Sequence, residues 1–271
     1  MKRGAGKRAL ARFPTLHSRL MRFRPATLLP TLFAASLLAP LVAQDRDEPR
    51  FRIGVGLSGG SFDFETEGSN LDDSDSAGMF RLQFEGTSSR GFGGGLRLES
   101  LATDDDFFVD AGFAATEVGN GSLFGHFTYR VEAHRFAMPI RAGLLLNGLV
   151  LDEVSSNDEV TYGSFGPYFE IAPEVVLARS GKTQWSLYGE VGFGGGVTFI
   201  DIEGDANEYE SSTGFFGLEF GTRLLLNKIE LGLAVVSRWQ SMDESEPEGS
   251  QVVRAYDADY HGLMFTFGVV F

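Results

Sequence analysis

The sequence predicts an all-β protein: a closed, antiparallel, up-and-down transmembrane β-barrel of about ten strands, preceded by a signal peptide, with eight or twelve strands as alternatives. Three observations predict it. Apolar residues alternate with small or charged residues along ten segments. The connections between those segments are alternately long and acidic or short and basic. Finally, the chain is 43% hydrophobic and lacks cysteine, which excludes a disordered chain, a disulfide scaffold and a Cys-ligated zinc site.

The N-terminal part of the chain has the layout of a secretory signal peptide. Residues 1–43 contain eight Lys or Arg and no acid, and an uncharged run, ATLLPTLFAASLLAPLVA, ends at Ala43 before the polar stretch QDRDEPR. A basic region, an apolar run and small residues before a polar segment form the signal-peptide order. We therefore predict a signal peptide at 1–43 with cleavage after Ala43, a short polar segment at 44–50 and the barrel at 51–271.

Two alternatives to this N-terminal assignment stay open. Translation could start at Met21, because MRFRPATLLP alone supplies a normal basic region. The apolar run could instead be a retained anchor helix, although Pro30 and Pro40 would interrupt it. After residue 50 the sequence contains no uncharged apolar run of the roughly 20 residues that a membrane-spanning helix needs.

Each predicted strand has one bulky apolar face and one face of smaller or charged residues. In the last segment, HGLMFTFGVVF, the bulky residues at 263, 265, 267, 269 and 271 fall on one face. The other face carries Gly262, Met264, Thr266, Gly268 and Val270. The same period of two recurs along the chain. The ten segments, in order, are 51–57, 80–84, 92–98, 127–131, 140–146, 169–177, 185–197, 216–224, 229–235 and 263–271.

The second face of these segments carries seven arginines and eight glutamates. These candidate interior residues are Arg52, Arg81, Glu85, Arg97, Glu99, Arg130, Glu132, Arg141, Glu170, Glu174, Glu190, Glu219, Arg223, Glu230 and Arg238. Buried charges require partners, so we expect a charge network in which neighbours such as Arg97/Glu99 and Arg130/Glu132 pair. An apolar outside around a charged inside fits a membrane barrel better than a soluble one, whose packed interior is apolar.

The connections place the two kinds of loop at opposite ends. The long connections hold 23 of the 37 acids and a single base, Arg254. Short turns towards the periplasm and long external loops are typical of outer-membrane barrels. The long connections are 65–77, 102–122, 148–163, 200–212 and 240–254, and the short ones are 87–91, 134–136, 179–184 and 227–228.

Three stretches resemble a known family. The final strand, HGLMFTFGVVF, is similar to the C-terminal insertion signal of Gram-negative-type outer-membrane β-barrel proteins, with Phe271 as the signal residue. FAMPIRAGLLL and FGPYFEIAPEV resemble the central hairpin of the small outer-membrane β-barrel (porin-like) family. The resemblance implies a bacterial outer-membrane location, outer-membrane lipid as the surroundings and the barrel-assembly machinery as a partner. It implies no activity, because the family includes porins, adhesins, structural barrels and a few enzymes.

The charged interior leaves two functions open. If the charges pair fully, the barrel is plugged and acts as a structural or surface-interaction protein that presents long acidic external loops. If water separates them, a narrow porin-like channel favours cations through its acidic mouth. Ten strands enclose a narrow interior, so the structural role is our expectation and the channel is the alternative.

Candidate sites for chemistry are weak. Asp257, Asp259 and His261 could assist a membrane-embedded hydrolase, but no matching motif accompanies them, so we predict no enzyme and no catalytic residue. The run at 54–59 matches G-x-G-x-x-G, but an acidic stretch follows it where a dinucleotide site needs a helix, so no cofactor is expected.

The negative charge of the long loops indicates which partners the protein could bind. Asp201, Glu203, Asp205 and Asn207 alternate along the chain but lack the spacing of a calcium loop, so we predict no defined metal site. Divalent cations are candidate weak partners of the acidic loops, and the negative charge argues against nucleic acid.

Overall fold

The computed structural model describes residues 50–68, 72–104, 107–109, 115–153, 159–203, 205, 207, 209–247 and 251–271. The predicted signal peptide at 1–43, its cleavage site, the alternative start and residues 44–49 lie outside the described residues. The part of the chain that the structure describes has no helix both long and apolar enough to cross a membrane.

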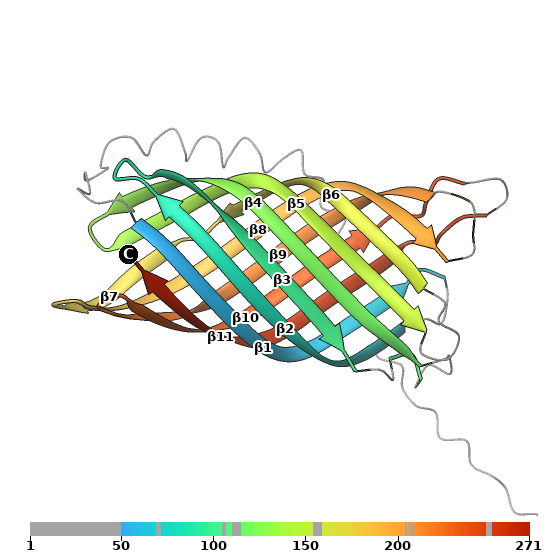
Figure 1. Cartoon of the computed structure of the whole chain (residues 1–271), viewed down its shortest axis with the longest axis horizontal. Coiled ribbons are helices and arrows are strands. Elements are labelled where there is room, and N and C mark those ends of the chain that lie inside the picture. The colour runs from blue at the N-terminus through green and yellow to red at the C-terminus, as the bar shows by residue number, and fades with distance from the viewer. Residues whose placement is uncertain are drawn as a thin grey trace, which may run out of the picture. The chain divides into compact units, whose positions relative to one another are not determined.

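The described residues form eleven antiparallel strands. They are β1 (Arg50–Thr66), β2 (Asp72–Thr87), β3 (Phe92–Thr103), β4 (Thr116–Ala133), β5 (Phe136–Glu153), β6 (Glu159–Ile171), β7 (Glu174–Ser180), β8 (Thr183–Ile202), β9 (Tyr209–Leu226), β10 (Ile229–Met242) and β11 (Tyr256–Val270). The sheet closes because β1 pairs with β11 as well as with β2. Figure 1 shows the strands inclined side by side around the barrel.

Two of these strands, β6 and β7, together occupy a single strand position in the barrel wall; we call each such position a stave. β6 and β7 both pair with β5 and β8, and the register continues across their junction, with Ile171 opposite Val191 and Glu174 opposite Tyr188. It shifts only further along β7, between Val176 and Ala178. Pro173 lies between β6 and β7, and proline has no N–H for the ladder. The barrel therefore has ten staves, and the predicted closed antiparallel barrel of about ten strands is confirmed.

The barrel wall carries an apolar belt on its outside. Large apolar side chains point outward along every stave, with Leu57, Leu144 and Phe127 exposed by 66%, 62% and 81%. Monomeric soluble proteins rarely expose contiguous apolar patches larger than a few hundred Å². This belt therefore suits a lipid environment.

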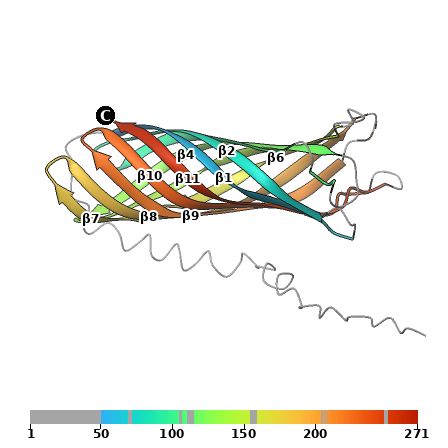
Figure 2. The ribbon, with the colours of Figure 1, turned by 90° about the horizontal axis from the view of Figure 1, so that it is seen from below.

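The long connections are shorter than the sequence predicts. β1 continues to Thr66 and β2 begins at Asp72, so most of the predicted loop 65–77 is strand. The ladder holds there because backbone hydrogen bonds do not depend on side-chain polarity, and Glu65 still faces Asp72. Figure 2 shows the short turns and the C-terminus at one end of the barrel, and the longer connections at the other.

Side-chain polarity inverts along the strands. In β1 the outward residues change from Leu57 to Asp63, while the inward residues change from Arg52 to Phe62 and Phe64. Near the short turns, the wall is apolar outside and charged inside. Near the long connections, it is polar outside and apolar inside, as in a soluble barrel.

An apolar cluster fills the interior at the long-connection end. We call it the apolar lid, and its buried members are Phe62, Phe64, Ala77, Met79, Leu101, Phe107, Phe108, Val118, Leu149, Tyr162, Ile200, Tyr209, Val236, Met242, Tyr256, Ala258, Tyr260 and Met264.

Two members of the apolar lid come from the connection between β3 and β4. Phe107 and Phe108 are 0% and 4% exposed, and their rings lie 5.9 Å from Phe62 and 5.7 Å from Phe64. Phe108 has a φ of 68°, a left-handed conformation that is strained for an aromatic residue. Phe107 and Phe108 thus lie inside the barrel and help to close that end.

Candidate functional site

The charged interior of the barrel is the candidate functional site. The period of two turns all fifteen predicted Arg and Glu residues away from the apolar outer face, and they come from every strand except β11. Each of them makes at least one ion pair with another member of the set. The structure divides them into two groups along the barrel.

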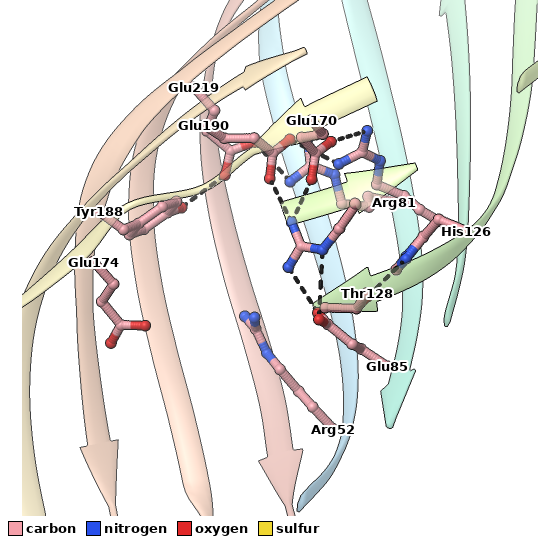
Figure 3. A network of polar contacts seen from close by, with 12 residues as sticks. Arg52, Arg81, Glu85, His126, Thr128, Glu170, Glu174, Tyr188, Glu190 and Glu219 are labelled. Atoms are coloured by element: carbon pink, nitrogen blue, oxygen red, sulfur yellow. Dashed lines mark hydrogen bonds and ion pairs between the residues drawn. The ribbon is translucent and has the colours of Figure 1, made fainter. Parts of the chain in front are cut away.

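The first group, which we call the central cluster, is almost completely removed from water except at Arg238, whose side chain is 19% exposed. It consists of Arg81, Arg97, Arg141, Arg238, Glu85, Glu99, Glu170, Glu190 and Glu219. Among them, the side chains of Glu170 and Glu219 are 0% and 2% exposed. Figure 3 shows Glu170, Glu190 and Glu219 converging on one region of the interior.

Contacts in the central cluster run across the barrel as well as along its wall. The Arg97 guanidinium on β3 lies 2.7 Å from a carboxylate oxygen of Glu170 on β6 and 2.7 Å from one of Glu190 on β8. Arg81 lies 2.8 Å from Glu219 on the far side, and Arg238 donates to Glu99 at 3.0 Å. These pairs therefore fill the cross-section with side chains from opposite walls.

The predicted pairings hold only in part. Arg130 pairs with Glu132 two residues along the same strand. Arg97 lies 3.7 Å from Glu99, but its two shorter contacts are across the barrel. The period of two in the sequence predicts the face on which a charged residue lies. Strand register and barrel width determine with which residue it forms an ion pair.

The second group, the turn-side cluster, lies nearer the short turns and is wetter. It consists of Arg52, Arg130, Arg223, Glu132, Glu174 and Glu230, with side chains 11% to 19% exposed. Arg223 lies 3.4 Å from Glu230 and 3.6 Å from Glu174. Figure 3 shows Arg52 and Glu174 set apart from the converging glutamates.

Neutral residues that the sequence interpretation missed support these charges. The hydroxyl of Tyr188 donates to Glu219 at 2.7 Å, and the guanidinium of Arg223 lies 3.8 Å from the centre of the Tyr188 ring, a cation–π contact. His126 contacts Thr128 at 3.0 Å inside the barrel. The signal was the same period of two, which places these residues on the inward face beside the charges.

Cavities lie on both sides of the central cluster. One of about 80 Å³ lies between it and the apolar lid, with Arg97 and Arg238 in its wall. On the other side, a cavity of about 80 Å³ is lined by Glu85 and Arg141, and one of about 280 Å³ lies at the short turns. The central cluster therefore separates the two ends of the interior.

The candidate hydrolase residues lie on the outer wall and not in the interior. Asp257, Asp259 and His261 alternate on the outward face of β11, beyond the apolar belt. His261 contacts the Ser237 hydroxyl at 3.0 Å, and Asp259 sits opposite Asp63 of β1. Partial burial, with neighbouring carboxylates including Asp63, raises the pKa of Asp259 to about 7.

The candidate cation ligands do not converge in the described residues. Asp205 accepts hydrogen bonds from the Tyr209 hydroxyl at 2.8 Å and from the Asn207 backbone at 3.0 Å, which closes its own turn. No group of three or more His, Asp or Glu among the described residues is arranged to hold a metal ion. Weak cation binding by the loops stays a prediction.

The C-terminal residue lies at the seam between the first and last strands. Phe271 exchanges backbone hydrogen bonds with Phe51, and the centres of the two rings lie 6.2 Å apart. The Phe271 side chain is 60% exposed on the outside of the barrel. It is accessible there, and its role in insertion stays a prediction.

Comparisons with known proteins agree with the barrel. A family model described as an outer membrane protein beta-barrel domain matches residues 31–271. Among solved structures, the outer membrane protease OmpT from Escherichia coli gives a TM-score of 0.50 at 8% identity, covering 83% of this chain and 97% of that chain. The outer membrane protein OprG from Pseudomonas aeruginosa gives 0.27 at 13% identity, covering 84% and 99%. No curated protein sequence matches the chain. At 8% identity, the likeness to OmpT shows the fold alone.

Proposed function

Because the chain belongs to the outer membrane protein β-barrel domain family, we propose that it is a closed barrel of the bacterial outer membrane that anchors and presents acidic loops. In this role the barrel is a structural or surface-interaction protein. The apolar belt contacts outer-membrane lipid, the short turns face the periplasm and the longer connections face outward. The proposal assigns the interior no transport of ions or solutes.

The observation that carries the proposal is that two successive layers of side chains fill the interior, the central cluster and the apolar lid. The central cluster joins opposite walls through contacts such as Arg97 to Glu190 at 2.7 Å. Beyond it, the apolar lid packs aromatic rings such as Phe62 and Phe107 against each other. Ions crossing the barrel would have to disrupt buried ion pairs and then enter an apolar region, and both steps are costly.

The proposal assigns no catalytic role to the barrel. Asp259 and His261 share the outer wall with Ser237 and Trp239, and the His261 and Trp239 rings lie 5.2 Å apart. Neither Asp259 nor His261 lines any of the three interior cavities described above. The hydrolase alternative therefore gains no support from the site.

Exposed residues of the barrel indicate its candidate binding partners. The exposed Phe271 is the candidate contact for the barrel-assembly machinery, and the acidic connections are the candidate contacts for divalent cations. The same negative charge disfavours nucleic acid.

Ion leakage from vesicles tests the closed state. The refolded barrel is placed in potassium-loaded vesicles, and insertion is checked by its folded electrophoretic mobility and by protection from protease. We expect potassium release no faster than from protein-free vesicles. Release that is rapid and faster for potassium than for chloride would instead support the narrow cation-favouring channel.

A further inference from the structure

The described residues around the interior at the short-turn end carry more positive than negative charge. Two cavities, of about 280 Å³ and about 80 Å³, share Arg50, Arg130, Glu174 and Gln184 in their walls. We call this joint space the vestibule. Among the described residues, seven arginines and four glutamates line it, an excess of three positive charges.

The excess charge comes mainly from residues at the rim of the vestibule. Arg135 follows β4 at its turn, and Arg179 lies near the end of β7; both line the larger cavity. No carboxylate of the described residues lies within ion-pair distance of either guanidinium, although Arg179 donates to Gln184 at 2.6 Å. Deeper in the vestibule, Arg130 and Arg223 share Glu174 at 3.9 Å and 3.6 Å.

The central cluster closes the inner end of the vestibule. Its five glutamates and four arginines leave one net negative charge, which offsets only part of the positive excess in the vestibule. The vestibule is therefore a blind, positively charged cup that opens at the short turns, which face the periplasm in barrels of this kind.

We infer that the vestibule binds a small anion carrying two or more negative charges on phosphate or carboxylate groups, taken up from the periplasmic side. Guanidinium groups bind such oxyanions through paired N–H donors, and several arginines around one cavity suit a multivalent ligand. The larger cavity, about 280 Å³, lies near the lower end of the range for small-molecule sites. The acidic outer end of the barrel repels anions, so access from the periplasm is also the electrostatically favoured route.

Calorimetric titration of the refolded full barrel in a neutral detergent tests this site. The probes are inorganic pyrophosphate and, separately, citrate, at low ionic strength. We expect saturable one-to-one binding of at least one probe, and at least tenfold weaker binding by the variant R135Q/R179Q. Pyrophosphate binding alone would assign phosphate chemistry, whereas binding of both probes would assign oxyanions in general.

A matched control separates the site from bulk charge. The variant R90Q/K228Q removes two positive charges from the same end of the barrel, at residues that do not line the vestibule. It should bind the probes as the parent does. The inference is overturned if neither probe binds at millimolar concentration, if R135Q/R179Q binds unchanged, or if the control loses affinity equally. Binding is measured without any ion flux, so this result is independent of whether the barrel is closed.

Discussion

Arg97 on β3 reaches across the barrel interior to Glu190 on β8, with Nη1 and Oε1 2.7 Å apart. The same guanidinium also lies 2.7 Å from Glu170, whose side chain is fully buried. One arginine thus ties three staves together in the cross-section. The consequence is that the central cluster both stabilises the barrel and blocks it.

Replacing Arg97 should destabilise the barrel strongly. In Arg97→Gln, the buried Glu170 and Glu190 lose one of the two arginines that they share, the other being Arg141. Breaking a buried pair costs about 3–5 kcal/mol. We expect the free energy of unfolding in urea, followed by the fluorescence of Trp185 and Trp239, to fall by that amount. The double variant R97Q/E190Q should recover part of the loss, since it removes one of the carboxylates that compete for the remaining arginines, Arg141 and Arg238.

The control for this prediction is a wetter arginine of the same interior. Arg130 is 19% exposed, and pairs with access to water contribute less, so Arg130→Gln should cost only about 1 kcal/mol. Equal losses for Arg97→Gln and Arg130→Gln would contradict the distinction between the central and turn-side clusters.

Gly60 is required where the first and last strands close the barrel. It faces Gly262 of β11, and a Cβ at Gly60 would lie 2.0 Å from the backbone oxygen of His261. Gly60→Ala should therefore lower the free energy of unfolding by about 1–3 kcal/mol, through strain that backbone atoms cannot relieve easily. Gly59→Ala is the matched control, because a Cβ at Gly59 meets nothing within 4 Å. Equal stability of the two variants in urea would show that the seam is more adaptable than its geometry indicates.

Asp259 should make stability depend on pH at the long-connection end. Its pKa is raised to about 7 in the folded barrel and returns to the ordinary value near 3.8 on unfolding. Between these values the folded state binds the proton more tightly, so this contribution to stability rises as the pH falls from about 7 to about 4. Asp259→Asn should be more stable than the parent at pH 8, and the difference should vanish near pH 4.

Asp201→Asn is the control for this pH dependence. Asp201 lies on the outer wall at the same end but faces Thr161 of β6 rather than another carboxylate. Thermal unfolding at the two pH values measures both variants. The same pH-dependent gain in Asp201→Asn would show that general surface charge, and not the site of Asp259, is responsible.

Orientation in the membrane can be read from single cysteines, because the natural chain has none. Glu67→Cys lies at the long-connection end and Ser88→Cys in a short turn. On intact cells, a bulky membrane-impermeant maleimide should label the first variant and should label the second only after the outer membrane is permeabilised. The reverse pattern would place the acidic connections in the periplasm and contradict the proposed display at the surface.

The sequence alone could predict the membrane part of the barrel well. Alternation along segments such as 51–57 indicates the apolar belt, and the inward position of residues such as Arg97 follows from the same period. This works because lipid outside and charge inside impose opposite polarity on neighbouring residues. The ten staves follow from counting these segments.

The part beyond the belt could not be predicted in the same way. Ser61, Asp63 and Glu65 have the composition of a loop, yet they continue β1 because the backbone ladder persists. The sequence signal for this extension of β1 was the inverted alternation, in which the apolar Phe62 and Phe64 lie on the inward face. The burial of Phe107 and Phe108, which lie between β3 and β4, could not be predicted, because no local pattern indicates that they enter the barrel.

Single-channel conductance across a planar bilayer tests the closed barrel most directly. The comparison is between the parent barrel and a variant that lacks both blocks, with R97S/E190S in the central cluster and F107S/F108S in the apolar lid, each checked for folded electrophoretic mobility. The account predicts a silent parent and discrete current steps from the variant. Discrete steps from the folded parent, with cations carrying most of the current, would contradict it.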